Sequence, residues 1–222
     1  MRIFNHFLTI RYLSKSFLIL SYPKSGNTYL RLLLGNYILA QNGLPAISSF
    51  DQLNNYMPEL GKYNTFKNNL QLHGKRIVKS HHAFYSGFAR FIVVHRPFIE
   101  VFGSYLAYSK ARDIHFHEQK KLQSIKLFVQ TIDPRHGVYL DYRTLIDHPE
   151  TQVSRLLYFL GEKSICKSSL AVAIDASRKE EIKRWSNENG IKFIQKYRQT
   201  TISEQHVEIL CDLDNQLKGK FQ

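Results

Sequence analysis

The feature that most constrains the fold is an apolar stretch, residues 17–20, that runs through a Tyr-Pro-Lys-Ser-Gly turn directly into a helical pattern. The pattern places apolar side chains on one helix face: Leu30, Leu33, Leu34, Tyr37 and Ile38. A strand–turn–helix gathers backbone N–H groups and the positive helix N-terminus around one point, and Lys24 adds an ammonium charge there. The sequence therefore predicts a βα unit that binds an anion, which we expect to be a phosphate or sulfate ester.

This turn differs from the common nucleotide-binding loop. Gly-x-x-x-x-Gly-Lys-Ser/Thr places the lysine after the last glycine, whereas Lys24 precedes Gly26. The order of the two residues therefore disfavours ordinary ATP or GTP chemistry.

Residues 22–29, Tyr-Pro-Lys-Ser-Gly-Asn-Thr-Tyr, resemble the 5′-phosphosulfate loop of sulfotransferases that use 3′-phosphoadenosine 5′-phosphosulfate (PAPS). The usual form in that family is Tyr-Pro-Lys-Ser-Gly-Thr-Thr-Trp. Asn27 and Tyr29 depart from it, but Asn keeps a polar contact and Tyr keeps an aromatic face for the adenine. The resemblance implies that Tyr29 lies at the adenine and that these residues bind the phosphosulfate: Lys24, Ser25, Gly26, Asn27 and Thr28.

A second motif follows about seventy residues later. Residues 96–105, Arg-Pro-Phe-Ile-Glu-Val-Phe-Gly-Ser-Tyr, are similar to the family's 3′-phosphate motif Arg-Asn-Pro-x-Asp-Val-x-x-Ser-Tyr, with the proline displaced by one position. The resemblance implies that Arg96, at a strand end, and Ser104, in the next helix, hold the 3′-phosphate. The alternative is that Arg96 only pairs with Glu100 as an ordinary i,i+4 contact.

The family's C-terminal Arg-Lys-Gly-x-x-Gly loop has no clean counterpart. Residues 178–179 and 196–198 are the candidates. The resemblance therefore covers residues 16–161 well and the final third of the chain weakly.

Sulfuryl transfer requires a base for the acceptor and a cation for the departing phosphate. Residues 79–81, Lys-Ser-His, resemble the Lys-Thr-His triplet of many PAPS enzymes, in which the histidine is the base. The resemblance implies that His81 is the general base, that Lys79 is its electrostatic partner, and that Lys24 stabilises the leaving phosphate.

Other bases stay open. His82 would exchange with His81 after a shift of one residue, and some carbohydrate-directed relatives use a glutamate, for which Glu59 and Glu100 are available. We expect no metal site, because the two histidines of residues 115–117 have no Cys or Asp partner at ligand spacing.

Short apolar runs at residues 75–80, 89–95 and 138–142 predict further strands. Helical patterns lie between and after them, at residues 98–112, 149–160, 170–185 and 203–217. We therefore expect an α/β fold with a central, mainly parallel sheet flanked by helices, and the resemblance implies the P-loop NTPase-like fold of sulfotransferases. At 222 residues, the chain is expected to form one domain, residues 1–222.

The formal charge of +13 favours anionic ligands without choosing among them. One alternative is a nucleotide-kinase-like phosphotransferase, but the chain lacks a Walker loop and a clear magnesium-holding acid after a strand. Another is a basic nucleic-acid-binding module, but the basic residues are dispersed, so we expect no specific nucleic acid. The charge is better explained by the anionic donor PAPS, and an anionic acceptor stays open as a further explanation.

The acceptor is expected to offer a hydroxyl or an amine to a pocket lined by residues 41–74 and 113–133, and we favour a glycan over a phenol or another small molecule. Two widely separated cysteines fit a reducing compartment, so we expect the cytoplasm. The apolar pattern of residues 1–15 is too interrupted to span a membrane. It favours a packed terminal helix, with peripheral contact with an anionic membrane as the alternative.

Overall fold

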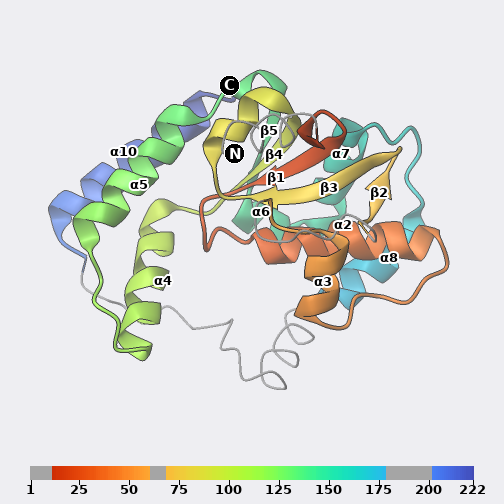
Figure 1. Ribbon diagram of the computed structural model, residues 1–222, viewed down its shortest axis with the longest axis horizontal. Coiled ribbons are helices and arrows are strands. Elements are labelled where there is room, and N and C mark those ends of the chain that lie inside the picture. Colours follow the sequence, from red (N-terminus) through yellow and green to blue (C-terminus); the bar gives the residue numbers. More distant parts are fainter. Residues whose placement is uncertain (1–11, 61–68, 179–201) are drawn as a thin grey trace, which may run out of the picture.

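The computed structural model describes residues 12–60, 69–178 and 202–222, and these residues contain a five-stranded sheet (Figure 1). The strands are β1 (Ser16–Leu20), β2 (Gln71–Leu72), β3 (Lys75–Ser80), β4 (Arg90–His95) and β5 (Gly137–Asp141). Their order across the sheet is β2-β3-β1-β4-β5. β2 pairs antiparallel with β3, and the other pairs are parallel. The expected α/β fold with a mainly parallel sheet is confirmed.

Helices cover both faces of this sheet. In chain order they are α2 (Asn27–Gln41), α3 (Phe50–Tyr56), α4 (Phe98–Ala111), α5 (Glu118–Thr131), α6 (Tyr142–Asp147), α7 (Pro149–Leu160), α8 (Lys167–Ala176) and α10 (Glu204–Gly219), with short 3-10 helices η1 (Ala83–Phe88) and η2 (Pro134–His136). Figure 1 shows α4, α5 and α10 together on one side and α2, α3 and α8 on the other. The sheet therefore forms the middle of three layers.

The hydrophobic core consists of two clusters, one on each face of the sheet, because successive side chains of a strand point to opposite faces. Phe17 and Ile19 of β1 pack with α2, α3, α7 and α8, whereas Leu18 and Leu20 pack with α4, α5 and α10. All five residues of β1 are buried, as expected of a central strand with helices on both faces.

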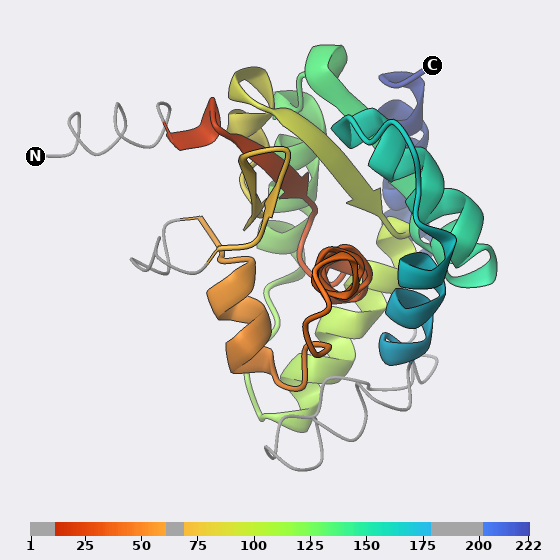
Figure 2. The ribbon, with the colours of Figure 1, turned by 90° about the vertical axis from the view of Figure 1, so that its right-hand side faces the viewer.

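Parallel pairing brings three strand ends to one edge of the sheet. Leu20 at the end of β1 lies opposite Ser80 of β3 and Val93 of β4. The arrows of β1 (red) and β4 (olive) point the same way in Figure 2, where α2 is seen nearly end-on. The loop after β1, His81 and Arg96 therefore all emerge at the carboxyl edge, where α/β sheets bind ligands.

Most predicted elements match the structure within a residue or two. The predicted strand at 138–142 ends one residue early, because the Asp141 side chain accepts a hydrogen bond from the backbone N–H of Thr144 (2.9 Å) and so starts α6 at Tyr142. Within 113–133, α5 buries three apolar side chains, Ile125, Phe128 and Val129. Of the helix predicted at 170–185, α8 covers the first part, and residues from 179 lie outside the described residues.

A buried polar network joins the C-terminal helix to the end of β4. The Asp214 carboxylate of α10 lies 2.7 Å from His95 Nε2 and accepts the backbone N–H of Phe98 at 3.0 Å. Tyr139 of β5 donates its hydroxyl proton to His95 Nδ1 at 2.7 Å. His95 is only 1% exposed, so these bonds satisfy its ring without water. The network therefore fixes the start of α4, next to Arg96.

We predict that Asp214→Ala lowers the free energy of unfolding by about 2–4 kcal/mol, because it leaves two buried N–H groups unpartnered. Urea denaturation measures this change. Asp212→Ala is the matched control, since Asp212 is exposed on the same helix and, among the described residues, accepts only from Gln216. We expect it to cost about 0.5 kcal/mol or less. Equal effects of the two substitutions would contradict the structural role of the network.

Candidate functional site

The loop between β1 and α2 depends on Gly26. Its φ of 96° lies in the left-handed region, where a side chain is strained. A Cβ at this position would come within 2.0 Å of the Tyr142 ring. Glycine is therefore required both by the backbone conformation and by the tyrosine packed against it.

Backbone donors are open at the start of α2. Tyr29 and Leu30 donate their N–H groups to the Gly26 carbonyl, but the N–H groups of Gly26, Asn27 and Thr28 have no hydrogen-bond partner among the described residues. Three successive open donors at the N-terminus of a 15-residue helix are an arrangement typical of anion-binding loops. That this loop binds an anion stays a prediction.

Two loop side chains are almost completely buried. The buried Ser25 hydroxyl has no hydrogen-bond partner in the described part of the chain. A phosphate oxygen would accept a hydrogen bond from it. Asn27 uses its amide N–H to bind the Ser21 hydroxyl at 2.9 Å, so its side chain braces the loop. Its Oδ1 also lacks a partner, but an oxyanion would not satisfy this acceptor. Asn27 therefore offers its backbone N–H, rather than its side chain, to an anion.

Lys24 has a positive φ of 73° and carries its ammonium group to α4, where it lies 4.5 Å from the centre of the Tyr108 ring. Burial lowers the pKa of Lys24, and the positive charge of Arg112 lowers it further. A bound anion would reverse this shift, because it favours the charged ammonium. Lys24 is thus a cation poised next to an anion site.

Tyr29, predicted to contact the adenine, forms an edge contact with the ring of Tyr142, with centroids 6.5 Å apart. Burial raises the pKa of Tyr29, and Tyr142 adds to the rise. The guanidinium of Arg96 lies 5.9 Å from the same Tyr142 ring. Tyr142 therefore links the loop to Arg96, and both parts of the predicted donor site meet at it.

Arg96 donates from Nε to Glu100 at 2.7 Å, the i,i+4 contact named as the alternative. Arg143 binds the other oxygen of that carboxylate. Burial by itself raises the pKa of Glu100, but the two arginines outweigh it, so the carboxyl pKa lies below its ordinary value. The terminal nitrogens of Arg96 make no hydrogen bond within the described residues, which leaves donors for a phosphate.

Ser104 is half-buried on α4, one turn after Glu100 and one turn before Tyr108. Residues four apart share a helix face, so these three side chains form a row along α4. Because Arg96 contacts the first residue of this row and Lys24 contacts the last, the row runs alongside both parts of the predicted donor site.

His81 lies immediately after β3, with Nδ1 2.7 Å from the carbonyl oxygen of Ser21. A carbonyl only accepts, so Nδ1 carries the proton of this hydrogen bond, and Nε2 would be the basic nitrogen of that tautomer. This tautomer is the one a general base requires. His82 is exposed, and its ring makes an edge contact with Tyr85. The hydrogen bond to the donor loop is therefore made by His81.

Lys79, the predicted partner of His81, forms an ion pair with Glu59 at 2.8 Å, and both side chains are about 15% exposed. Their backbones also meet in a parallel bridge. The positive charge of Lys79 is therefore compensated by a residue that was itself an alternative base.

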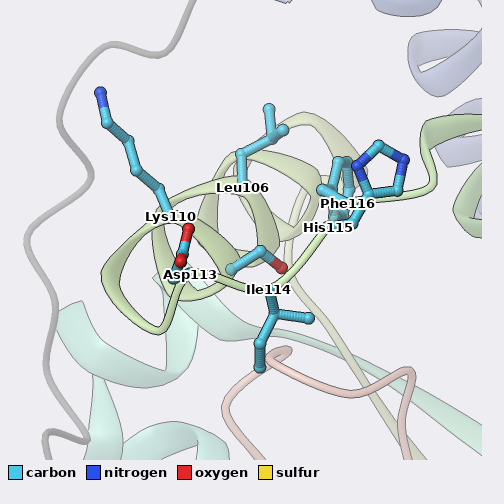
Figure 3. Close-up of a pocket in the computed structure, with 7 residues that line it drawn as sticks. Leu106, Lys110, Asp113, Ile114, His115 and Phe116 are labelled. Carbon is cyan, nitrogen blue, oxygen red and sulfur yellow. The ribbon is translucent and has the colours of Figure 1, made fainter.

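A cavity of about 460 Å³ lies at the end of α4 and the loop that follows it (Figure 3). It is lined by Leu106, Ser109, Lys110, Asp113, Ile114, His115 and Phe116, so the predicted acceptor segment 113–133 contributes to it. However, Leu106 and Lys110 are each two residues from Tyr108, roughly 200° around the helix. The cavity therefore lies on the side of α4 away from Lys24.

Sequence reasoning missed Tyr108 and Arg112 as neighbours of the loop. Both follow Ser104 at i,i+4 spacing along one helix face, which was the available signal. No local pattern in the sequence shows that the ring of Tyr142 packs on Gly26.

Of the candidate C-terminal residues, Arg178 pairs with exposed Asp175 at 2.9 Å, and residues 179 and 196–198 lie outside the described residues. Within the described ranges there is no group of three His, Cys, Asp or Glu side chains that would hold a metal ion. None of the helices seen there combines the length and the apolar character needed to cross a bilayer.

We predict that Gly26→Ala is more destabilising than Gly43→Ala. Both glycines have positive φ, but nothing lies within 4 Å of a Cβ at Gly43. Strain alone should cost Gly43→Ala about 1–2 kcal/mol, and the clash with Tyr142 should add about 1–3 kcal/mol at Gly26. Urea unfolding compares the two variants, and equal losses would refute the packing of Tyr142 on the loop.

Comparison with known proteins identifies the family. The family model described as "Sulfotransferase domain" matches residues 14–208. Retinol dehydratase, solved with androsterone and the inactive cofactor PAP, superposes with a TM-score of 0.51 at 13% identity, covering 94% of this chain and 81% of that chain. Mouse sulfotransferase SULT7A1, complexed with PAP, gives a TM-score of 0.45 at 14% identity, covering 94% and 78%. No curated protein sequence matches the chain. The match over most of its length shows that this chain belongs to the sulfotransferase domain family.

Proposed function

We propose that this protein transfers a sulfuryl group from PAPS to an acceptor hydroxyl or amine. The observation that carries the proposal is the loop after β1, which combines three open backbone N–H groups, a buried unpartnered Ser25 hydroxyl and the cation Lys24. These groups are donors and a cation, which suit the oxyanions of a phosphosulfate. Membership of the family gives the reaction class.

The donor would be held at two places. The loop residues Lys24 to Thr28 would bind the phosphosulfate, while Arg96 and Ser104 would bind the 3′-phosphate. This division is supported by the row of side chains along α4 and by the open donors of Arg96. Tyr29 and Tyr142 would flank the adenine. The retinol dehydratase structure holds the inactive cofactor PAP, which agrees with PAPS as the donor.

PAPS would supply an electrophilic sulfur attached to a good leaving group. His81 Nε2 would take the proton of the acceptor as the acceptor oxygen or nitrogen bonds to sulfur and the bond from sulfur to the phosphate oxygen breaks. Lys24 would stabilise the negative charge that develops on the departing phosphate. Lys79 would act more weakly than predicted from sequence, because its charge is paired with Glu59.

The acceptor is proposed to be a glycan. The retinol dehydratase structure holds androsterone, a small hydroxyl-bearing molecule, so a small acceptor is the alternative. Family membership favours this reaction over the kinase-like and nucleic-acid-binding alternatives. No metal is invoked.

We also infer one domain for residues 1–222, because both core clusters pack on the same sheet. Cys166 and Cys211 are both exposed thiols, which fits a reducing compartment such as the cytoplasm. The proposed contact with an anionic membrane depends on residues 1–15, most of which lie outside the described residues.

Titration with PAP, the desulfated product of the donor, tests the donor site. We expect calorimetry to detect PAP binding and little response to ATP. Lys24→Ala and Arg96→Ala should each weaken PAP binding by about tenfold or more, since each removes hydrogen bonds to a charged group. Absence of PAP binding by the folded wild-type protein would overturn the proposed function.

Replacement of His81 tests the base. His81→Asn should preserve the hydrogen bond to Ser21 but lower the rate of transfer from labelled PAPS by about 10²–10⁴-fold, with PAP affinity retained. His82→Asn is the matched control and should leave the rate nearly unchanged. The opposite result, with the loss at His82, would reassign the base by one residue.

A further inference from the structure

We propose that the acceptor carries an anionic group, a carboxylate or a sulfate, and that Arg112 and Lys121 bind this group beside the donor loop. The inference deepens the proposed function and rests on it. The inference is based on positive charges near the C-terminal end of α4. No carboxylate in the described structure compensates these charges.

The first observation is that two cations share one aromatic ring. The Lys24 ammonium and the Arg112 guanidinium each lie 4.5 Å from the centre of the Tyr108 ring, so the two charged groups are at most twice that distance apart. Arg112 directly follows the last residue of α4, and its side chain is exposed. Like charges at this distance repel each other, and an anion between or beside them relieves the repulsion.

The second observation adds a third cation, from another helix. The Lys121 ammonium of α5 lies 3.6 Å from the centre of the Tyr105 ring. Tyr105 in turn makes an edge contact with Tyr22 of the donor loop, with centroids 6.3 Å apart. Burial lowers the pKa of Lys121. Lys121 is thus tied to the same loop through two aromatic rings.

None of these three cations forms an ion pair with a carboxylate in the described part of the chain. Other basic groups at the site are compensated, since Arg96 pairs with Glu100 and Lys79 pairs with Glu59. Tyrosine rings provide the contacts of the three cations, and a ring holds a cation without neutralising its charge. The positive charge that no carboxylate compensates at this site is therefore carried by Lys24, Arg112 and Lys121.

The position along α4 assigns the anion to the acceptor. Arg96, proposed to hold the 3′-phosphate with Ser104, contacts the first residue of the row on α4, and Lys24 meets the last, Tyr108. Arg112 lies one turn further along. The two anionic groups of the donor are thus already assigned to residues before Arg112, and an acceptor approaching the sulfur from beyond Lys24 would meet Arg112 and Lys121.

A matched pair of oligosaccharides tests the proposal on the PAP-loaded protein. Unsulfated chondroitin oligosaccharide bears carboxylates, whereas dextran oligosaccharide of similar size is neutral. By calorimetry at constant salt we expect the anionic probe to bind and the neutral one to bind much more weakly. Arg112→Gln and Lys121→Gln should each lower affinity for the anionic probe by about tenfold, while PAP affinity stays within about twofold.

Lys110→Gln is the control, because Lys110 is an exposed lysine on the other side of the same helix. It should leave both affinities unchanged. Equal binding of the two probes, no binding of the anionic probe at millimolar concentration, or an equal loss in Lys110→Gln would overturn the proposal. A loss of PAP affinity in Arg112→Gln would assign the cation to the donor instead. Because PAP binding is measured first, failure of the donor site is distinguished from failure of this inference.

Discussion

Parallel pairing of β1 with β3 and β4 is the constraint on which the site depends. Each strand delivers a different functional group to the same edge: the anion-binding loop after β1, His81 after β3, and Arg96 after β4. These groups are far apart in the sequence, and the register between the strands decides which of them meet. The Ser21 carbonyl, which fixes the His81 ring, is accessible to it only because the ends of β1 and β3 lie side by side.

The site combines fixed donors with cations held by aromatic rings. Open backbone N–H groups at the start of α2 cannot move away, since they belong to a helix packed against the sheet. Lys24, Arg112 and Lys121 instead rest on tyrosines of α4. Such contacts position a charge without cancelling it, so the positive potential stays available to ligands. Arg96 and Lys79 are different, because carboxylates already compensate them.

The sequence predicted the fold because its local signals agree with one another. The apolar residues Phe17 to Leu20 predict a buried strand, and Pro23 and Gly26 predict a turn. The apolar residues that follow have helical spacing. The bounds of helix α7 were also predicted from local residues, because Pro149 begins the helix and Gly161, with a φ of 108°, ends it. No local pattern predicted the buried face of α5, because long-range packing decides which of its side chains are covered.

The sequence by itself determined the strand–turn–helix at residues 16–41, the order of strands and helices along the chain, and the family to which the motifs point. These properties are local, because they depend on residue type and spacing within short segments. Only the tertiary structure decided that Tyr142 packs on Gly26, that Asp214 anchors the start of α4, and that Glu59 neutralises Lys79. Each of these contacts joins residues at least twenty positions apart, and side-chain partners at such separations follow from how the layers pack, which no local pattern encodes.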